Sequence, residues 1–318
     1  MKKIIILPII LGTLLVVGGA IAIGFAYMNN KDEIEEKTYE LTDDFEKFNI
    51  NLSTADLSFK KSEGGAKRVV VKERKKEYHT VEVKDGTLSI QFVDEVKWYE
   101  KIFRFHFNSM KVEVYLPEGE YNDLTIKTAT GDVYVPAAFS FNSAEVKVST
   151  GNIEVGSTVT NNMRLTASTG NVHYHDATAK NLNIKTSTGN ITVKDVAIND
   201  QVTLNASTGR IKTENLTCVN MNAETDTGDV SLTNVLVNSN IEIHTDTGDV
   251  TFSDSDAQSV KVKTSTGDVD ATFLTKKIIS ATSSTGRIRT PSADEMVGAT
   301  GTCEVKTSTG SINIKIKA

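Results

Sequence analysis

A short motif recurs at an almost fixed interval from residue 124 onward, and it constrains the fold more than any other feature. Each copy is a Thr-Gly pair followed by one variable residue and then a Val or Ile. The repeat glycines are Gly131, Gly151, Gly170, Gly189, Gly209, Gly228, Gly248, Gly267, Gly286 and Gly310. They lie 19 or 20 residues apart, except for a last interval of 24. Such a period is typical of solenoids, in which each unit packs only against its neighbours.

The residues around each glycine indicate β-strands. Positions five and seven before the glycine are apolar, and most residues two and four positions after it are apolar again. This alternation has the period of a strand, and its phase changes at the glycine, where a bend needs unusual backbone angles. Threonine, a β-branched residue favoured in strands, occurs 39 times, and 33 copies follow Leu124. Each unit is therefore predicted to contain short strands and no helix.

A unit of 19 or 20 residues cannot bury its apolar side alone, so successive units are expected to stack in register. The prediction is an all-β fold, a single-stranded parallel β-solenoid of about ten coils over residues 124–318, with threonine hydroxyls pairing along the rod. At about 4.8 Å per coil the rod is roughly 48 Å long. The usual crossover preference favours a right-handed coil. The long interval predicts a plain bulging loop around Pro291–Gly301.

Three segments carry a family resemblance. These are Val112–Pro117, Leu124–Val133 and the recurring Thr-Ser-Thr-Gly-Asp-Val run. They resemble the bacterial putative-adhesin β-strand-repeat family, a domain of unknown function that includes LiaG-like membrane-anchored envelope proteins of Gram-positive bacteria. The resemblance covers about residues 45–318. It implies the fold, an envelope location and a link to cell-wall stress, and it brings no catalytic residues with it.

The N-terminus predicts a membrane anchor. Ile4–Tyr27 contains no charged residue and follows Lys2 and Lys3. At about 1.5 Å per residue these 24 residues span roughly 36 Å, enough to cross a bilayer. We expect a single-pass signal anchor over residues 1–28, with a cytoplasmic N-terminus and an extracellular remainder. Small-x-small sites such as Ala20–Ala22 leave signal-peptide cleavage as the alternative.

Two segments separate this anchor from the repeats. Residues 29–44 are polar and acidic and are predicted to be a solvated stalk or short helical spacer, and residues 45–123 an irregular β cap region. Ser53–Leu57 resembles a repeat turn that has lost its glycine. The aromatic residues expected to close the core are Phe92, Trp98, Tyr99, Phe103, Phe105 and Phe107. A locally basic series offers an alternative surface for anionic lipid or wall polymer: Lys60, Lys61, Lys67, Arg68, Lys72, Arg74, Lys75 and Lys76.

The acidic residues of the repeats suggest two kinds of chemistry. Asp226-Thr227-Gly228 and Asp246-Thr247-Gly248 match the aspartic-protease triplet, but each is simply a repeat turn with Asp in place of Ser. Stacked carboxylates on neighbouring coils could instead bridge calcium, a hard cation that prefers oxygen ligands. The candidates are Asp226, Asp229, Asp246, Asp249 and Asp268. The alternative is a solvated acidic edge without metal.

Other candidate sites are weaker. His173 and His175 point to the same side of a predicted strand, but no third metal ligand is evident. Cys218 and Cys303 lie about four coils apart in sequence order, too far for a disulfide, so both are expected to be free thiols. No nucleotide-binding loop, nucleophile elbow or zinc spacing occurs.

These observations favour a non-catalytic structural or binding module of the cell envelope, without cofactor. The expected partners are the membrane and a cell-wall polymer or envelope protein. A net charge of −6 and a pI near 5.5 argue against nucleic-acid binding. The alternative is a carbohydrate-active β-helix enzyme, although near-uniform coils leave few loops to frame a catalytic groove. Adhesion to host or matrix surfaces is a third hypothesis.

Overall fold

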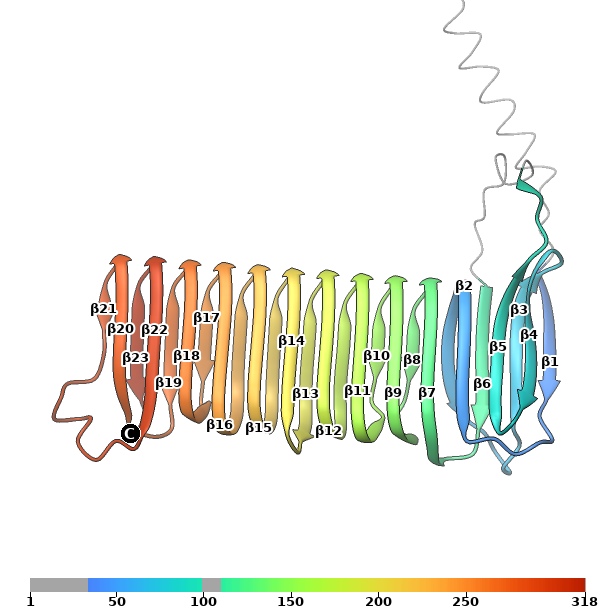
Figure 1. Ribbon diagram of the computed structural model, residues 1–318, viewed down its shortest axis with the longest axis horizontal. Coiled ribbons are helices and arrows are strands. Elements are labelled where there is room, and N and C mark those ends of the chain that lie inside the picture. Colours follow the sequence, from blue (N-terminus) through green and yellow to red (C-terminus); the bar gives the residue numbers. More distant parts are fainter. Residues whose placement is uncertain (1–33, 99–109, 318) are drawn as a thin grey trace, which may run out of the picture.

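The computed structural model describes residues 34–98 and 110–317, so the predicted membrane anchor lies outside the described residues. Within these ranges no helix has the length and apolar character needed to cross a membrane. The described residues form 23 β-strands, hydrogen-bonded into one continuous sheet that winds into a rod (Figure 1). The predicted all-β parallel solenoid is confirmed.

Strands with parallel pairing build the rod. They are β2 (Lys47–Lys61), β7 (Gly119–Thr130), β8 (Val133–Val135), β9 (Phe139–Thr150), β10 (Ile153–Val155), β11 (Thr158–Thr169), β12 (Val172–Thr188), β13 (Ile191–Ile198), β14 (Gln201–Thr208), β15 (Ile211–Thr227), β16 (Val230–Thr247), β17 (Val250–Ser253), β18 (Asp256–Thr266), β19 (Val269–Phe273), β20 (Lys277–Thr285), β21 (Ile288–Arg289), β22 (Gly301–Thr309) and β23 (Ile312–Ile316). The N-terminal end adds β1 (Ile34–Glu40), β3 (Arg68–Arg74), β4 (Glu77–Lys84), β5 (Thr87–Asp94) and β6 (Met110–Leu116).

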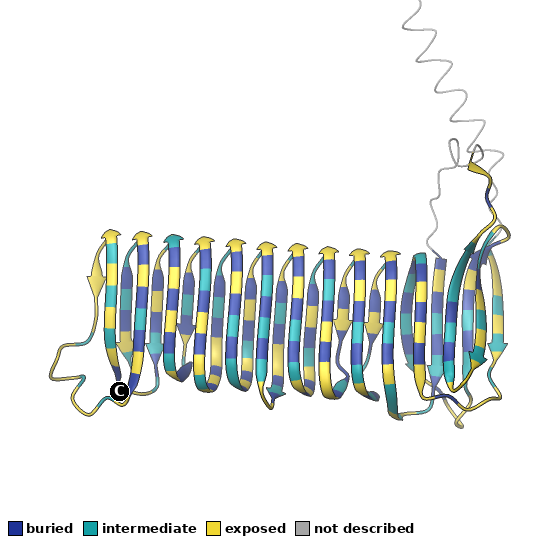
Figure 2. Cartoon of the chain, in the orientation of Figure 1, coloured by how far each residue is buried: buried dark blue, intermediate teal, exposed yellow. Residues whose placement is uncertain are grey.

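The coils stack in the predicted register. Val133, Ile153 and Val172 are directly paired on successive coils, and all three are fully buried. Buried and exposed residues alternate along every long strand, so the apolar columns form one core running the length of the rod (Figure 2). Burial of β-branched and aliphatic side chains between coils therefore supplies the main driving force for folding.

The repeat glycine is required by close approach of neighbouring coils. Gly209 has a φ of 147°, and a Cβ added to it would lie 2.0 Å from the carbonyl oxygen of Gly189 on the preceding coil. Its own N–H donates to the carbonyl of Thr227 on the following coil at 2.9 Å. No residue with a side chain fits at this corner without moving one coil away from the next.

The threonine hydroxyls form hydrogen bonds at the same corner, but with partners other than those predicted. Inward-facing threonines three positions before the glycine donate their hydroxyls to the glycine carbonyl of the preceding coil. Thr186 and Thr225 are fully buried and reach Gly170 and Gly209 at 3.1 Å. The hydroxyls thus satisfy backbone carbonyls that would otherwise be buried without a partner, rather than pairing with one another.

The last two coils are stacked out of sequence order. β22 pairs with β18 on one side and with β20 on the other, and β23 lies between β19 and β21 in the same way. The chain passes from β19 to the outermost coil, turns through residues 290–300, and returns to fill the gap (Figure 1). The loop predicted around Pro291–Gly301 is therefore a reversal, and the expectation that successive units stack on one another fails for the last two coils.

Side-chain polarity explains this order. The outermost coil carries Ala281, Ser283 and Thr290 where other coils carry inward-facing apolar or buried residues, and all three are at least partly exposed. The C-terminal coil carries Val305, Thr307 and Ile314 at the matching positions, and all three are buried. Placing the more polar coil at the end buries more apolar surface and resembles the capping repeats of other solenoids.

At the other end, the segment around Ser53–Leu57 is a true coil, as predicted. β2 pairs in parallel with β7 and β8, and Gly131 stacks on the carbonyl of Ala55. Beyond β2 the sheet continues as β5 and β4 on one side and as β6, β3 and β1 on the other.

The aromatic residues that close the core at this end differ from those predicted. The observed cluster is Phe45, Phe48, Phe59, Tyr121, Phe139 and Phe141. Among the predicted residues, Phe92 does pack against the core and on His79, whereas Trp98 is exposed. Tyr99, Phe103, Phe105 and Phe107 lie outside the described residues.

Part of the segment predicted to be a stalk is instead a strand. β1 pairs antiparallel with β3 over seven residues. Lys37 of β1 donates to the buried Glu73 of β3 at 2.8 Å, and the second oxygen of Glu73 accepts from the His79 backbone N–H at 2.6 Å. His79 Nδ1 lies 3.2 Å from the same oxygen. Glu73 therefore ties β1, β3 and β4 together, which explains why this acidic segment is ordered.

Candidate binding surface

One exposed column of the rod concentrates positive charge near the cap. Four residues before the glycine, the first four regular coils carry Lys127, Lys147, Thr166 and Lys185, on the strands β7, β9, β11 and β12. Parallel pairing places these residues in direct register. Arg164 lies on the same face, two positions before Thr166 in β11. We call Lys127, Lys147, Arg164 and Lys185 the basic strip.

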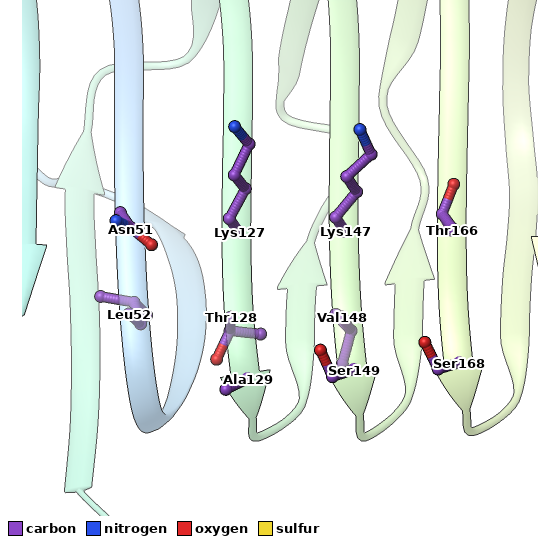
Figure 3. A pocket seen from close by; sticks show the side chains of 10 residues that line it. All are labelled: Asn51, Leu52, Lys127, Thr128, Ala129, Lys147, Val148, Ser149, Thr166 and Ser168. Carbon is purple, nitrogen blue, oxygen red and sulfur yellow. The ribbon is translucent and has the colours of Figure 1, made fainter.

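A shallow open groove of about 370 Å³ runs across this strip. Lys127 and Lys147 extend side by side in the same direction, and Ser149 and Ser168 present hydroxyl groups at the ends of neighbouring strands (Figure 3). The groove crosses several coils, so it offers ammonium and hydroxyl groups at the coil repeat of about 4.8 Å. Such a surface suits an extended chain lying along the rod better than a compact small molecule.

The charges of the basic strip are only partly neutralised, by Glu145. Lys127 and Lys147 are directly paired on adjacent strands, and like charges opposite one another are destabilising. Lys147 contacts Glu145 at 2.9 Å, and this hydrogen bond holds the pKa of the Glu145 carboxyl below its usual range. Within the described residues, Lys127 and Lys185 have no ion pair. Arg164 is directly paired with Glu145 across the strands, and the charges of Arg164 and Lys127 also lower the pKa of Glu145, so one carboxylate partly offsets the four cations.

On this face, positive charge is present near the cap and again near the far end of the rod, where Lys261, Lys263 and Lys306 lie. Between these two regions the exposed residues are acidic: Glu224, Asp226, Glu242 and Asp246. The basic strip is therefore separated from the distal lysines by an acidic middle section. A polyanion would be attracted to the strip and repelled from the middle of the rod.

The predicted calcium candidates fall into two different columns. Asp229, Asp249 and Asp268 follow the repeat glycine, and each accepts a backbone N–H from the next coil, at 2.6–3.1 Å. The hydrogen bond from the Asp249 N–H lowers the pKa of Asp229, with a further contribution from Arg210. Asp226 and Asp246 lie two residues before the glycine, around the corner. Among the described residues no group of three or more His, Cys, Asp or Glu side chains is arranged to hold a metal ion.

We expect calcium to leave the thermal unfolding midpoint unchanged, because the turn carboxylates are already used as backbone acceptors. Thermal melts followed by circular dichroism with added calcium or with a chelator test this prediction. A calcium-dependent rise that is lost in Asp249→Asn would contradict it and restore the metal hypothesis.

The histidines and cysteines of the described ranges do not form a site. At the surface, His175 Nδ1 lies 2.9 Å from Asp176 Oδ2, and its Nε2 lies 3.5 Å from Glu154 Oε1. Cys218 and Cys303 are free and buried, as predicted. Burial raises the pKa of each thiol to about 12, so neither is a nucleophile at neutral pH.

The basic series expected in the cap region is largely neutralised by acidic partners. Lys60 contacts Glu113 at 2.7 Å, and Lys72 contacts Glu36 at 3.0 Å. Lys67 contacts Asp44 at 2.6 Å, and Lys61 is paired with Glu118. The basic strip on the first regular coils was missed in the sequence. Comparing the residues four positions before each glycine would have found it.

The structure defines a β-solenoid with a shallow polar groove on one face. The chain belongs to the Toastrack DUF4097 family, whose model matches residues 45–200 and 197–318. No curated protein sequence matches the chain.

Several solved structures are similar to the chain. A putative adhesin from Bacteroides fragilis is 16% identical, with 89% of this chain and 98% of that chain covered and a TM-score of 0.45. A protein from Parabacteroides distasonis, described as a putative lipid binding protein, is 19% identical, with 74% and 96% covered and a TM-score of 0.49. A putative adhesin from the same organism is 14% identical, with 89% and 98% covered and a TM-score of 0.48.

Proposed function

We propose that this protein is a non-catalytic, membrane-anchored module of the cell envelope that binds an anionic wall polymer through the basic strip. The observation that carries the proposal is the pairing of Lys127 with Lys147 in an open groove, without ion-pair compensation for Lys127. The uncharged Ile4–Tyr27 segment supports the membrane anchor and the extracellular location. The predicted anchor precedes β1 in the sequence, so the N-terminal end of the rod would face the membrane. The basic strip would then lie on the regular coils nearest the membrane.

The ligand class follows from the groove. Ammonium groups spaced by one coil attract phosphate or carboxylate groups, while the neighbouring serine hydroxyls can donate to or accept from sugar or polyol oxygens. A repeating polyanion contacts several coils at once, so weak individual contacts add through multivalency. Phosphodiester polymers of the wall combine both chemistries.

Charge reversal tests the proposal. The double variant Lys127→Glu/Lys147→Glu should bind poly(glycerol phosphate) at least about tenfold more weakly than the wild type, a loss of ~1.4 kcal/mol. The matched control is Lys263→Glu/Lys306→Glu, a directly paired lysine couple in the same column on distant coils, and it should retain affinity. Titration calorimetry measures the three affinities. Equal affinities for all three proteins would show that the basic strip is not the polymer-binding surface.

The same samples distinguish binding from catalysis. After prolonged incubation with the protein, the polymer should keep its length on gel filtration. Shortening that depends on the protein would favour the carbohydrate-active alternative instead. Binding of the polymer without shortening supports the non-catalytic module.

A further inference from the structure

A lysine and an aspartate meet inside the rod, where charged groups are rare. Lys277 is 1% exposed and Asp256 is 9% exposed. Lys277 Nζ donates to Asp256 Oδ1 and, at 2.6 Å, to Thr275 Oγ1. The other carboxylate oxygen, Asp256 Oδ2, is buried and has no hydrogen-bond partner among the described residues. Such a half-satisfied buried carboxylate is costly and calls for an explanation.

The pair spans the coil that is inserted out of sequence order. Asp256 begins β18, Lys277 begins β20, and β22 lies between these strands. The lysine side chain passes directly over Gly301, the first residue of β22. A Cβ at Gly301 would lie 2.9 Å from Lys277 Cδ and 3.1 Å from Nζ. Lys277 and Asp256 thus clamp the inserted coil from its two neighbours.

The surroundings of the pair exclude water. Lys277 Nζ lies 5.9 Å above the ring centre of Phe273, which is buried and packs on Phe252. Cys303 of the inserted coil is also buried nearby. Burial raises the pKa of its thiol, the charge of Lys277 lowers this pKa, and the charge of Asp256 raises it. A site from which solvent is excluded favours the loss of water in a condensation, because the reverse hydrolysis needs water to return.

We propose that Lys277 and Asp256 condense to an intramolecular isopeptide bond. The Lys277 ammonium first gives a proton to the Asp256 carboxylate. The Nζ lone pair then forms a bond with Asp256 Cγ, and the bond from Cγ to the protonated oxygen breaks. A second proton passes from the nitrogen to that oxygen, which leaves as water. Nothing is oxidised or reduced, so no co-reactant is needed.

The geometry favours this step. A nitrogen in hydrogen-bond contact with a carboxylate oxygen lies within about 3–3.5 Å of the carboxyl carbon, the distance of a near-attack conformer. The hydrogen bond to Thr275 Oγ1 leaves the nitrogen lone pair free to face Asp256. The product amide would join β18 to β20 covalently and would hold the inserted coil in place when the rod is pulled.

Peptide mapping of the purified full-length protein tests the proposal. After unfolding and tryptic digestion, the peptides 213–261 and 277–287 should appear as one linked species, lighter than their sum by one water molecule, with no cleavage after Lys277. Lys277→Arg, which removes the amine nucleophile, should abolish the linked species. The exposed pair of Lys317 and Asp254, 2.9 Å apart, is the matched control and should remain unlinked.

The wild-type digest alone decides the question, even if a variant fails to fold. Complete cleavage after Lys277, with 213–261 recovered at its unmodified mass, would show an ordinary buried ion pair and overturn the proposal.

Discussion

Replacing Gly209 with alanine should lower the free energy of unfolding by more than about 4 kcal/mol, a loss that single substitutions rarely reach. The added Cβ would lie 2.0 Å from the Gly189 carbonyl oxygen, which is fixed in the backbone of the neighbouring coil. The φ of 147° adds backbone strain for any residue with a side chain. Because each coil is held by the next, the clash cannot relax without separating two coils.

Gly86→Ala is the matched control for this substitution. Gly86 also has a positive φ, 70°, but a Cβ there meets no atom within 4 Å. The control should cost only about 1–2 kcal/mol, the ordinary penalty for a left-handed residue. Urea unfolding followed by circular dichroism gives both values. Equal losses would show that backbone angle, and not contact between coils, makes glycine necessary at the repeat corner.

Replacing Glu73 with alanine should cost about 3–5 kcal/mol, the usual penalty for breaking a buried charged network. The change removes the acceptor for the His79 backbone N–H and the partner of Lys37, and it leaves a cavity at a fully buried position. Glu82→Ala on β4 is the control, because Glu82 is exposed and should change stability by less than about 0.5 kcal/mol. Urea unfolding of both variants measures the difference.

The effect of Glu73 should depend on pH. Burial raises the pKa of this carboxyl, but the hydrogen bonds from His79 and Lys37 outweigh burial and leave the pKa below its unfolded value of 4.5. A lowered folded-state pKa stabilises the protein above the unfolded value, and this contribution is lost as the pH falls through the folded value. The gap between wild type and Glu73→Ala should therefore narrow below pH 4.5. A gap that widens on acidification would contradict this assignment.

The sequence predicts most of the solenoid because the same short motif, with the same local conformation, recurs in every coil. The glycine, the inward threonine and the alternating apolar columns each reflect a contact between identical positions on adjacent coils, so their period reveals the stacking. The order of the last coils depends instead on a comparison between coils. Ala281 and Thr290, at positions where most other coils carry larger apolar residues, were the signal, and it becomes visible only when equivalent positions are compared between coils.

The other differences arise from contacts between segments far apart in the chain. β1 has the alternation of a strand, but its acidic residues indicate a solvated spacer until their partners on β3 are known. The Lys277–Asp256 pair reaches across a whole coil, because β22 is inserted between the strands that carry these residues. The lysines of the basic strip recur at one position of the repeat. They can be recognised as one surface only when the pairing of neighbouring strands is known.

The most direct test of the proposed function compares two polymers of similar length that differ in charge. The full-length protein should bind poly(glycerol phosphate) and not dextran, and its affinity should fall as added salt screens the lysines of the basic strip. Titration calorimetry at low and physiological ionic strength makes this measurement. Binding that is equal for the charged and the neutral polymer, or that is insensitive to salt, would contradict the assignment of the basic strip as the binding surface.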